Sequence, residues 1–266
     1  MRASHDPSGK SIMLVDGYGL AFRAFHALPE TLATASGEIT NAVYGFSSML
    51  LDALGQYHPD YVIVSFDVGK TFRHEAFDGY KAHRAPMPDS MRQQMDRIFE
   101  VLDALNVPIC TKEGYEADDV IGTLAREGSA AGMKVLIVTG DSDLLQLAEG
   151  SVQIILPGRQ RFGDYREFNR SQVEGRYGFE PERIPEFKAL VGDPSDNIPG
   201  VPGIGQKTAT TLIQTYPSLE VMRDHLDEIK PPRARASLDE NFEQALAGRN
   251  LATIVRDLDI DVQLEE

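Results

Sequence analysis

The chain has 266 residues, of which 42% are hydrophobic and 25% charged, so it can bury a sizeable core in one or two domains. No apolar run reaches the length of a membrane span and residues 1–10 are polar, so we expect a cytoplasmic protein with no membrane partner. The single cysteine, Cys110, excludes an internal disulfide and fits a reducing compartment. The formal net charge of −15, taken alone, argues against nucleic acid as a partner, because phosphate contacts need Lys and Arg.

Three apolar runs, at 12–15, 61–66 and 135–138, predict buried parallel strands. Between them, apolar residues recur at helical spacing over 41–57, 90–105 and 117–131. Strands that alternate with helices predict an α/β fold with a mainly parallel central sheet flanked by helices.

The pattern changes beyond about residue 150. A short run at 152–156 predicts one more strand, 157–163 fits a loop, and short helices begin at Ser171 and Pro185. Residues 193–205 are rich in Gly and Pro, which predicts turns, and a helix resumes over 207–216. We therefore expect an α/β domain over 1–175 and a helical subdomain over 176–266.

Acidic residues follow each of the three predicted strands, and two more acidic clusters lie further along the chain. The carboxyl ends of parallel strands meet at one edge of a sheet, so side chains distant in sequence are expected to converge there. The candidate metal ligands are Asp16, Asp67, Glu116, Asp118, Asp119, Asp141, Asp143, Asp193 and Asp196.

Carboxylates gathered in this way repel one another unless they are protonated or held by cations. Oxygen ligands without a matching His or Cys set select hard ions, so Mg²⁺ or Mn²⁺ is expected. Two such ions can activate water and stabilise the leaving oxygen of a phosphodiester. Each Asp could instead cap a helix, Asp118 and Asp119 could open one, and Asp196 could belong to a turn. Capping does not explain acid at three strand ends together with two further clusters.

In the order in which they occur, these motifs resemble the 5′ nuclease superfamily, in particular the N-terminal 5′-3′ exonuclease domain of bacterial DNA polymerase I and its stand-alone relatives. The matching segments span nearly the whole chain: Leu14-Val15-Asp16-Gly17, Phe66-Asp67, Phe72-Arg73, Tyr80-Lys81-Ala82-His83-Arg84, Glu116-Ala117-Asp118-Asp119, Thr139-Gly140-Asp141-Ser142-Asp143, Gly192-Asp193-Pro194-Ser195-Asp196-Asn197-Ile198-Pro199-Gly200 and Gly203-Ile204-Gly205. The resemblance implies a PIN-like nuclease fold. It also implies that the nine acids bind metal, with Asp67 and Asp141 central to catalysis and Asp143, Asp193 and Asp196 favouring a second ion.

The resemblance also implies DNA-binding elements. Residues 69–90 correspond to a helical arch that grips the single-stranded 5′ end, with Lys81 and Arg84 at the scissile phosphate, Arg73 on phosphate and Tyr80 stacked on a base. A helix–three-turn–helix element would bind duplex phosphate through Gly203, Ile204, Gly205, Gln206, Lys207 and Thr208. Carbonyl groups around this turn would hold a K⁺ ion, and by position they are those of Leu190, Val191, Pro199, Val201 and Ile204.

The expected function is therefore structure-specific 5′-3′ exonuclease or flap endonuclease activity, by a two-metal mechanism, in DNA replication and repair. The substrates would be DNA with a 5′ flap, a nick or a frayed 5′ end, and RNA-primed strands. A haloacid-dehalogenase-like phosphatase is an alternative because Asp141 and Asp143 follow a strand, but Leu145 stands where that family has Thr or Val. A non-catalytic DNA-binding module is another. Residues 250–266 resemble the segment that leads into the rest of a polymerase, so a covalently linked polymerase domain is an open possibility.

Overall fold

The computed structural model describes residues 2–3, 6–158 and 164–264, and it divides into two compact units. The first, here called the sheet unit, comprises Met1–Thr71, Pro86–Asn169 and Val255–Glu266. The second, here called the helical unit, comprises Phe72–Ala85 and Arg170–Ile254. The sequence-based division at residue 175 followed chain order, whereas the structure groups 72–85 with the helical unit and 255–266 with the sheet unit.

The sheet unit is built on six strands in the order β4-β3-β2-β5-β6-β7, and only the β6–β7 pair is antiparallel. The predicted mainly parallel α/β fold is confirmed. A separate parallel pair joins the two ends of the chain. The strands are β1 (Arg2–Ala3), β2 (Ser11–Asp16), β3 (Tyr61–Ser65), β4 (Ile109–Cys110), β5 (Lys134–Val138), β6 (Val152–Pro157), β7 (Tyr165–Phe168) and β8 (Gln263–Leu264).

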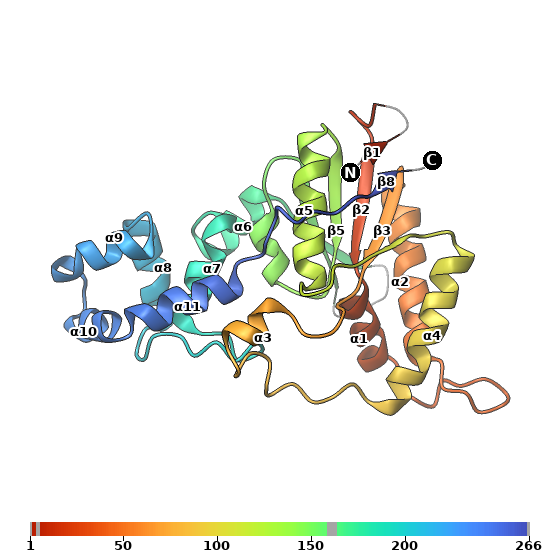
Figure 1. Cartoon of the computed structure of the whole chain (residues 1–266), viewed down its shortest axis with the longest axis horizontal. Coiled ribbons are helices and arrows are strands. Elements are labelled where there is room, and N and C mark those ends of the chain that lie inside the picture. The colour runs from red at the N-terminus through yellow and green to blue at the C-terminus, as the bar shows by residue number, and fades with distance from the viewer. Residues whose placement is uncertain (1, 4–5, 159–163, 265–266) are drawn as a thin grey trace. The chain divides into compact units, whose positions relative to one another are not determined.

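Both faces of the sheet are covered by helices, which is why its central strands are apolar throughout. The helices of this unit are α1 (Gly17–Ala27), α2 (Asn41–Tyr57), α4 (Asp89–Ala104), α5 (Ala117–Ala130) and the 3₁₀ helix η1 (Asp143–Leu147). One face packs Val15, Val64 and Val138 into a core shared with α1, α2 and α4. On the other face α5 runs along β2 and β5 (Figure 1). Gly128 permits this close packing, since a Cβ there would lie 3.2 Å from Val135 Cγ2.

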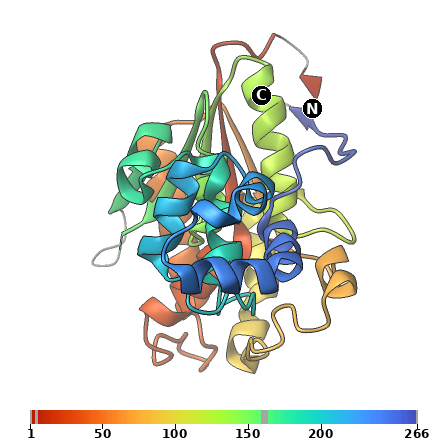
Figure 2. The ribbon, with the colours of Figure 1, turned by 90° about the vertical axis from the view of Figure 1, so that its left-hand side faces the viewer.

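The helical unit consists of short helices, of which α3 is drawn in orange and those from residue 170 onward are drawn from green to blue (Figure 2). They are α3 (Phe72–Ala76), α6 (Arg170–Tyr177), η2 (Pro181–Arg183), α7 (Ile184–Val191), α8 (Gln206–Thr215), α9 (Leu219–Asp224), η3 (Leu226–Glu228), α10 (Pro232–Glu240) and α11 (Phe242–Ala252). Residues 192–205 link α7 to α8 and include a turn in which Asp193 and Ile198 exchange both backbone hydrogen bonds at 2.8 Å. In the part of the chain that the structure describes, no helix is both long and apolar enough to span a bilayer. Most of the loop expected at 157–163 lies outside the described residues.

Candidate metal centre

The three strands that deliver acids, β3, β2 and β5, are neighbours in the sheet. Asp16 is the last residue of β2, Asp67 follows β3, and Asp141 follows β5. The strands are parallel and in register, with Val15 paired to both Val64 and Val138, so their carboxyl ends lie at one edge. The predicted convergence of these acids on one edge of the sheet is what the topology produces.

Hydrogen bonds from neighbouring groups orient these carboxylates. Asp16 Oδ1 accepts from the Gly19 amide at 2.8 Å, which caps α1, and Oδ2 accepts from Thr139 Oγ1 at 2.8 Å. The Thr139 hydroxyl in turn accepts from the Asp141 amide at 2.9 Å, so it ties the end of β5 to Asp16. Asp67 Oδ1 accepts from the Ala117 amide at 2.6 Å. Helix capping and acid clustering therefore coexist at Asp16.

The first turn of α5 adds three more acids. Glu116 and Asp119 form a capping box, in which each side chain accepts from the other residue's backbone N–H. Asp118 is half-buried and faces negative charge: burial first, and then Asp141, Asp16, Glu116 and Asp67, raise the pKa of Asp118 well above its ordinary value. At Asp143, the backbone amide donates to Asp141 Oδ1 at 2.9 Å as η1 begins.

The electrostatics of Asp16 show whether the acids at this edge of the sheet are suited to bind a cation. Burial raises the pKa of Asp16 to about 6, the charges of Asp141 and Asp67 add to the rise, and the bonds from Gly19 and Thr139 oppose it. The register partner of Asp16 on β3 is Ser65, whose Oγ is buried and has no hydrogen-bond partner among the described residues. Mutually repelling carboxylates and an unsatisfied hydroxyl, all oxygen donors, fit a hard divalent cation.

In the helical unit the two remaining acids are matched by cations. Lys188 Nζ lies 2.5 Å from Asp193 Oδ2, and Arg84 Nη2 lies 2.7 Å from Asp196 Oδ1. Burial opposes ionisation of Asp193, but Lys188 and hydrogen bonds from Ser195 hold its pKa below the ordinary value. One carboxylate oxygen of Asp193 lies within 4.8 Å of one of Asp196.

Two residues expected to contact DNA are buried. Arg73 is 2% exposed, and its guanidinium donates to the Leu251 and Thr253 carbonyls at 2.8 Å each. Tyr80 is 3% exposed, packs with Ile198 and Leu251, and directs its hydroxyl to Asp196 Oδ2 at 3.1 Å. The expected phosphate contact of Arg73 and base stacking of Tyr80 are therefore not available in this structure, because neither side chain reaches solvent.

Lys81 and Arg84 lie at the surface of the helical unit. Lys81 adopts a positive φ of 53°, and its Nζ lies 5.0 Å from the centroid of the Tyr80 ring. The Arg84 side chain is about half exposed (48%) beside Asp196, and its Nε donates to the Ser195 carbonyl at 3.3 Å. Both basic groups therefore stand next to the turn that carries the acids of this unit.

Residues 200–208, here called the hairpin, present backbone to solvent at Gly203 and Gly205, while the Ile204 side chain is buried. Gly200, at φ 67°, lies so close to Val191 and Gly192 that a Cβ would fall within 2.6 Å of their backbone. Among the carbonyls expected to hold K⁺, that of Leu190 accepts from Val201 N at 2.8 Å and that of Val201 accepts from Ile204 N at 3.1 Å.

Sequence reasoning missed the side chains that support the hairpin. Ser237 Oγ donates to the Pro202 carbonyl at 2.5 Å, and Gln244 Nε2 donates to the Gly200 carbonyl at 2.6 Å. The exposed Arg233 lies against the hairpin, since a Cβ on Gly203 would be 3.5 Å from Arg233 Nε. The only signal in the sequence is a run of three basic residues, Lys230, Arg233 and Arg235, in a mostly acidic chain.

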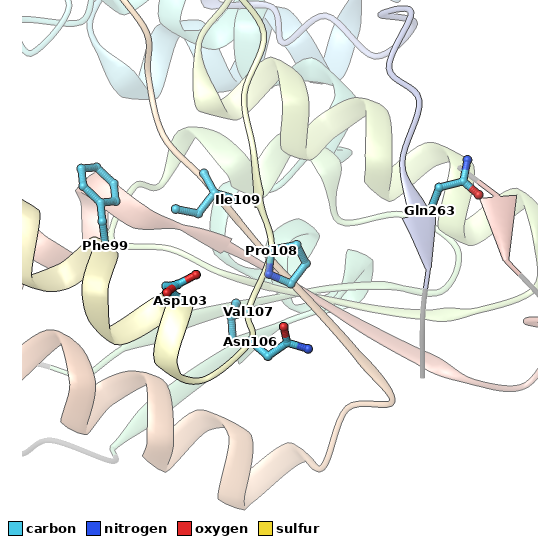
Figure 3. Close-up of a pocket in the computed structure, with 7 residues that line it drawn as sticks. All are labelled: Phe99, Asp103, Asn106, Val107, Pro108, Ile109 and Gln263. Carbon is cyan, nitrogen blue, oxygen red and sulfur yellow. The ribbon is translucent and has the colours of Figure 1, made fainter.

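A hollow of about 400 Å³ lies elsewhere in the sheet unit, around the loop between α4 and β4 (Figure 3). None of the predicted site residues lines it. Its walls are Phe99, Asp103, Asn106, Val107, Pro108, Ile109 and Gln263. The candidate metal ligands therefore lie at the edge of the sheet and not in this hollow.

Comparison with known families gives two matches that together cover residues 11–266. Residues 11–178 match the model described as 5′-3′ exonuclease, N-terminal resolvase-like domain, and residues 179–266 match 5′-3′ exonuclease, C-terminal SAM fold. DNA polymerase I of Chloroflexus aurantiacus is 46% identical over 259 residues, which are 96% of this chain and 27% of that protein. The Bacillus subtilis DNA polymerase I is 42% identical over 96% of this chain and 29% of its own length. The chain thus spans less than a third of these relatives.

Solved structures share the fold. A complex of the bacteriophage T5 flap endonuclease with DNA and metal ions superposes with a TM-score of 0.73 at 24% identity, covering 92% of this chain and 90% of that one. The catalytic core of Rad2 in complex with DNA superposes with a TM-score of 0.59 at 15% identity, covering 92% and 78%. At these identities the likeness concerns the fold.

Proposed function

Because the chain belongs to the 5′-3′ exonuclease family, we propose that it is a nuclease that hydrolyses DNA phosphodiesters at 5′ ends and 5′ flaps with two divalent cations, Mg²⁺ or Mn²⁺. The observation that carries the proposal is the set of acids at the carboxyl ends of β3, β2 and β5 and on the first turn of α5. Asp16, Asp67, Glu116, Asp118 and Asp141 would hold the catalytic cation. The assignment of Asp143, Asp193 and Asp196 to a second cation remains a prediction from the family resemblance.

A bound divalent cation supplies Lewis-acid stabilisation of phosphoryl oxygens and activates water as the nucleophile. The protein's own contribution is orientation. Thr139 and the Gly19 amide fix the two oxygens of Asp16, and the Ala117 amide fixes Asp67, so these ligands need no reorganisation when charge develops. Lys81 and Arg84 would offset the growing charge on the phosphate, with Arg84 exchanging its bond to Asp196 for one to the phosphate.

The hairpin would bind duplex phosphate through backbone amides, with Lys207 at the start of α8, and a K⁺ ion at the surrounding carbonyls would reinforce it. Such contacts read no bases, so specificity would be for structure: a flap, a nick or a frayed 5′ end, including RNA-primed strands. The proposal extends to a role in replication and repair, to a cytoplasmic location, and to a covalently linked polymerase domain as in the relatives. Residues 1–175 and 176–266 would be the catalytic and DNA-binding domains.

Incubation with a 5′-flap duplex, with Mg²⁺ and with EDTA, tests the proposal. We expect cleavage near the branch that requires the metal, and loss of cleavage in Asp67→Ala and Asp141→Ala, while DNA binding in EDTA persists. Asp96→Ala is the matched control, because this acid is exposed on α4. Absence of metal-dependent cleavage by the unaltered protein would contradict the nuclease, and release of phosphate from small esters instead would favour a phosphatase.

A further inference from the structure

Asp119 is used differently from the acids around it. It is fully buried (0% exposed), and both carboxyl oxygens accept backbone N–H groups: Oδ2 from Glu116 at 3.0 Å and Oδ1 from Val255 at 2.8 Å. The neighbouring Asp118 is half-buried. Successive helical residues project about 100° apart, so the side chains of Asp118 and Asp119 leave the helix in different directions. The first turn of α5 therefore sends one carboxyl group to the acids and the other into the protein.

The second partner of Asp119 belongs to residues 255–264, here called the terminal segment, which follows α11 and is part of the sheet unit. One turn further along α5, Thr123 Oγ1 accepts from the Leu258 amide at 3.3 Å and donates to the Asp119 carbonyl at 2.9 Å. Asp119 and Thr123 are four residues apart and thus share a face of the helix. Together they form a buried polar strip along which the terminal segment is bonded.

Contacts beyond α5 hold the rest of the terminal segment. Lys112 Nζ donates to the Asp259 carbonyl at 2.7 Å, and Arg256 pairs with Glu149. Strand β8 continues the attachment by pairing with β1. The terminal segment is therefore held along its length by hydrogen bonds, an ion pair and strand pairing. Of these contacts, the hydrogen bond to Asp119 lies beside Asp118, one of the acids that would bind metal.

We propose, on the basis of the metal centre proposed above, that Asp119 is a positioning residue and not a metal ligand. Its carboxyl group joins the terminal segment to the first turn of α5 and so fixes the direction in which Glu116 and Asp118 point. An amide at this position keeps one accepting oxygen but loses the other, which leaves a buried backbone N–H without its acceptor. The effect should then pass to the acids through the helix terminus, without removal of any ligand.

Mn²⁺ titration by calorimetry and amide hydrogen exchange, both on the full chain without DNA, test this role. For Asp119→Asn we expect an unchanged number of bound Mn²⁺ ions and an affinity lower on the order of tenfold, as is typical when a supporting partner of a ligand is lost. In the metal-free protein, exchange at Val255 and Leu258 should accelerate. Asp118→Asn is the matched variant one residue away, and it should weaken Mn²⁺ binding while exchange in the terminal segment stays as in the wild type.

Loss of one bound Mn²⁺ in Asp119→Asn, with unchanged exchange, would make Asp119 a ligand and overturn the inference. Faster exchange with unchanged Mn²⁺ affinity would reduce it to a purely structural group, which also overturns the inference. Should Asp119→Asn fail to fold, Thr123→Val carries the test, since it removes the acceptor of Leu258 N and no carboxylate. It should weaken Mn²⁺ binding in the same direction. A wild type that binds no Mn²⁺ would contradict the proposed metal centre. Exchange at Val255 and Leu258 is measured without metal, so it would distinguish that outcome from a failure of the inference about Asp119.

Discussion

Asp16 serves two purposes with one carboxyl group, since it caps α1 and stands among the acids at the edge of the sheet. A cap favours negative charge at a helix N-terminus, whereas burial and the neighbouring carboxylates disfavour it. Burial and repulsion win, because the pKa of Asp16 is raised to about 6. The metal-free protein therefore contains a residue whose charge opposes folding at neutral pH.

This conflict predicts how stability depends on pH. Because the folded pKa of Asp16, about 6, exceeds the ordinary value of 3.8, its protonation stabilises the fold. That stabilisation is complete below pH 4 and is lost as the pH rises through 6. The gap corresponds to about 3 kcal/mol. In EDTA, the free energy of unfolding of Asp16→Asn relative to the wild type should therefore increase by up to that amount as the pH rises from 4 to 7. Urea unfolding measures it.

Divalent metal provides the control for the Asp16 prediction. A bound cation favours the ionised carboxylate, so saturating Mg²⁺ should stabilise the wild type at pH 7 and remove the advantage of Asp16→Asn. A stability difference between the two proteins that does not change with pH in EDTA would contradict the raised pKa.

Arg233 is the residue through which the hairpin can be tested. Most basic side chains of the helical unit are paired with carboxylates, whereas Lys207, Lys230 and Arg233 form no ion pair with any residue that the structure describes. We expect Arg233→Ala to weaken binding of a 5′-flap duplex in EDTA about three- to tenfold and to lower the salt dependence by about one ion. Arg235→Ala, which removes a cation 3.5 Å from Asp227, is the matched control and should change neither quantity. Equal losses in both variants would point to general charge and not to the hairpin.

At the scale of elements, hydrophobic period predicted what lies in the sheet unit. Helix α2 spans 41–57 as expected, and the three predicted strands agree with β2, β3 and β5 to within a residue or so. Helix α1 was not predicted from the sequence because its first turn contains Gly17 and Gly19, which are poor helix formers, and because it depends on the cap at Asp16. Strand β7 was not predicted either, because its sequence, YREF, is short and mostly polar, and because its pairing with β6 is a tertiary contact.

The candidate site also contains residues whose placement the sequence predicted and residues whose placement it did not. Strand ends predicted where Asp16, Asp67 and Asp141 converge, because parallel topology brings those ends together without knowledge of side-chain packing. Arg73 and Tyr80 could not be assigned in this way. A basic or aromatic residue in a polar segment is normally exposed, and burial arises here from carbonyls and apolar residues more than a hundred positions further along the chain.

Two glycines of α2 should respond oppositely to Ala, which isolates helix propensity from packing. Gly55 is exposed, and a Cβ there would meet nothing within 4 Å, so Gly55→Ala should stabilise the protein by about 0.5–1 kcal/mol. Gly45 is buried, and its Cβ would lie 2.8 Å from that of Ala24 on α1, so Gly45→Ala should destabilise it by about 1–3 kcal/mol. Thermal unfolding measures both, and changes of equal sign would contradict the α1–α2 packing.

On the scale of the whole molecule, an acidic protein must approach an acidic substrate. The net charge of −15 does not describe the field that DNA meets, because charges beyond about 10 Å are screened at moderate salt. In the helical unit the cations at Arg84 and Lys188 neutralise the acids beside them. In the sheet unit the charges of the neighbouring carboxylates add to burial in raising the pKa of Asp118, so negative charges repel one another there. Local repulsion at the metal centre, and not the total charge, should therefore limit affinity for DNA without metal.

Two variants with the same net charge test this. Asp141→Asn and Asp96→Asn each raise the formal charge by one, but Asp141 belongs to the acidic cluster whereas Asp96 is exposed on α4. In EDTA at about 0.1 M salt, Asp141→Asn should bind a 5′-flap duplex several-fold more tightly than the wild type, because the scissile phosphate meets one carboxylate fewer. Asp96→Asn should leave the affinity unchanged. The gain in Asp141→Asn should vanish when Ca²⁺ fills the centre, since the cation then cancels the repulsion in the wild type as well. Equal gains in both variants would show instead that total charge governs the encounter.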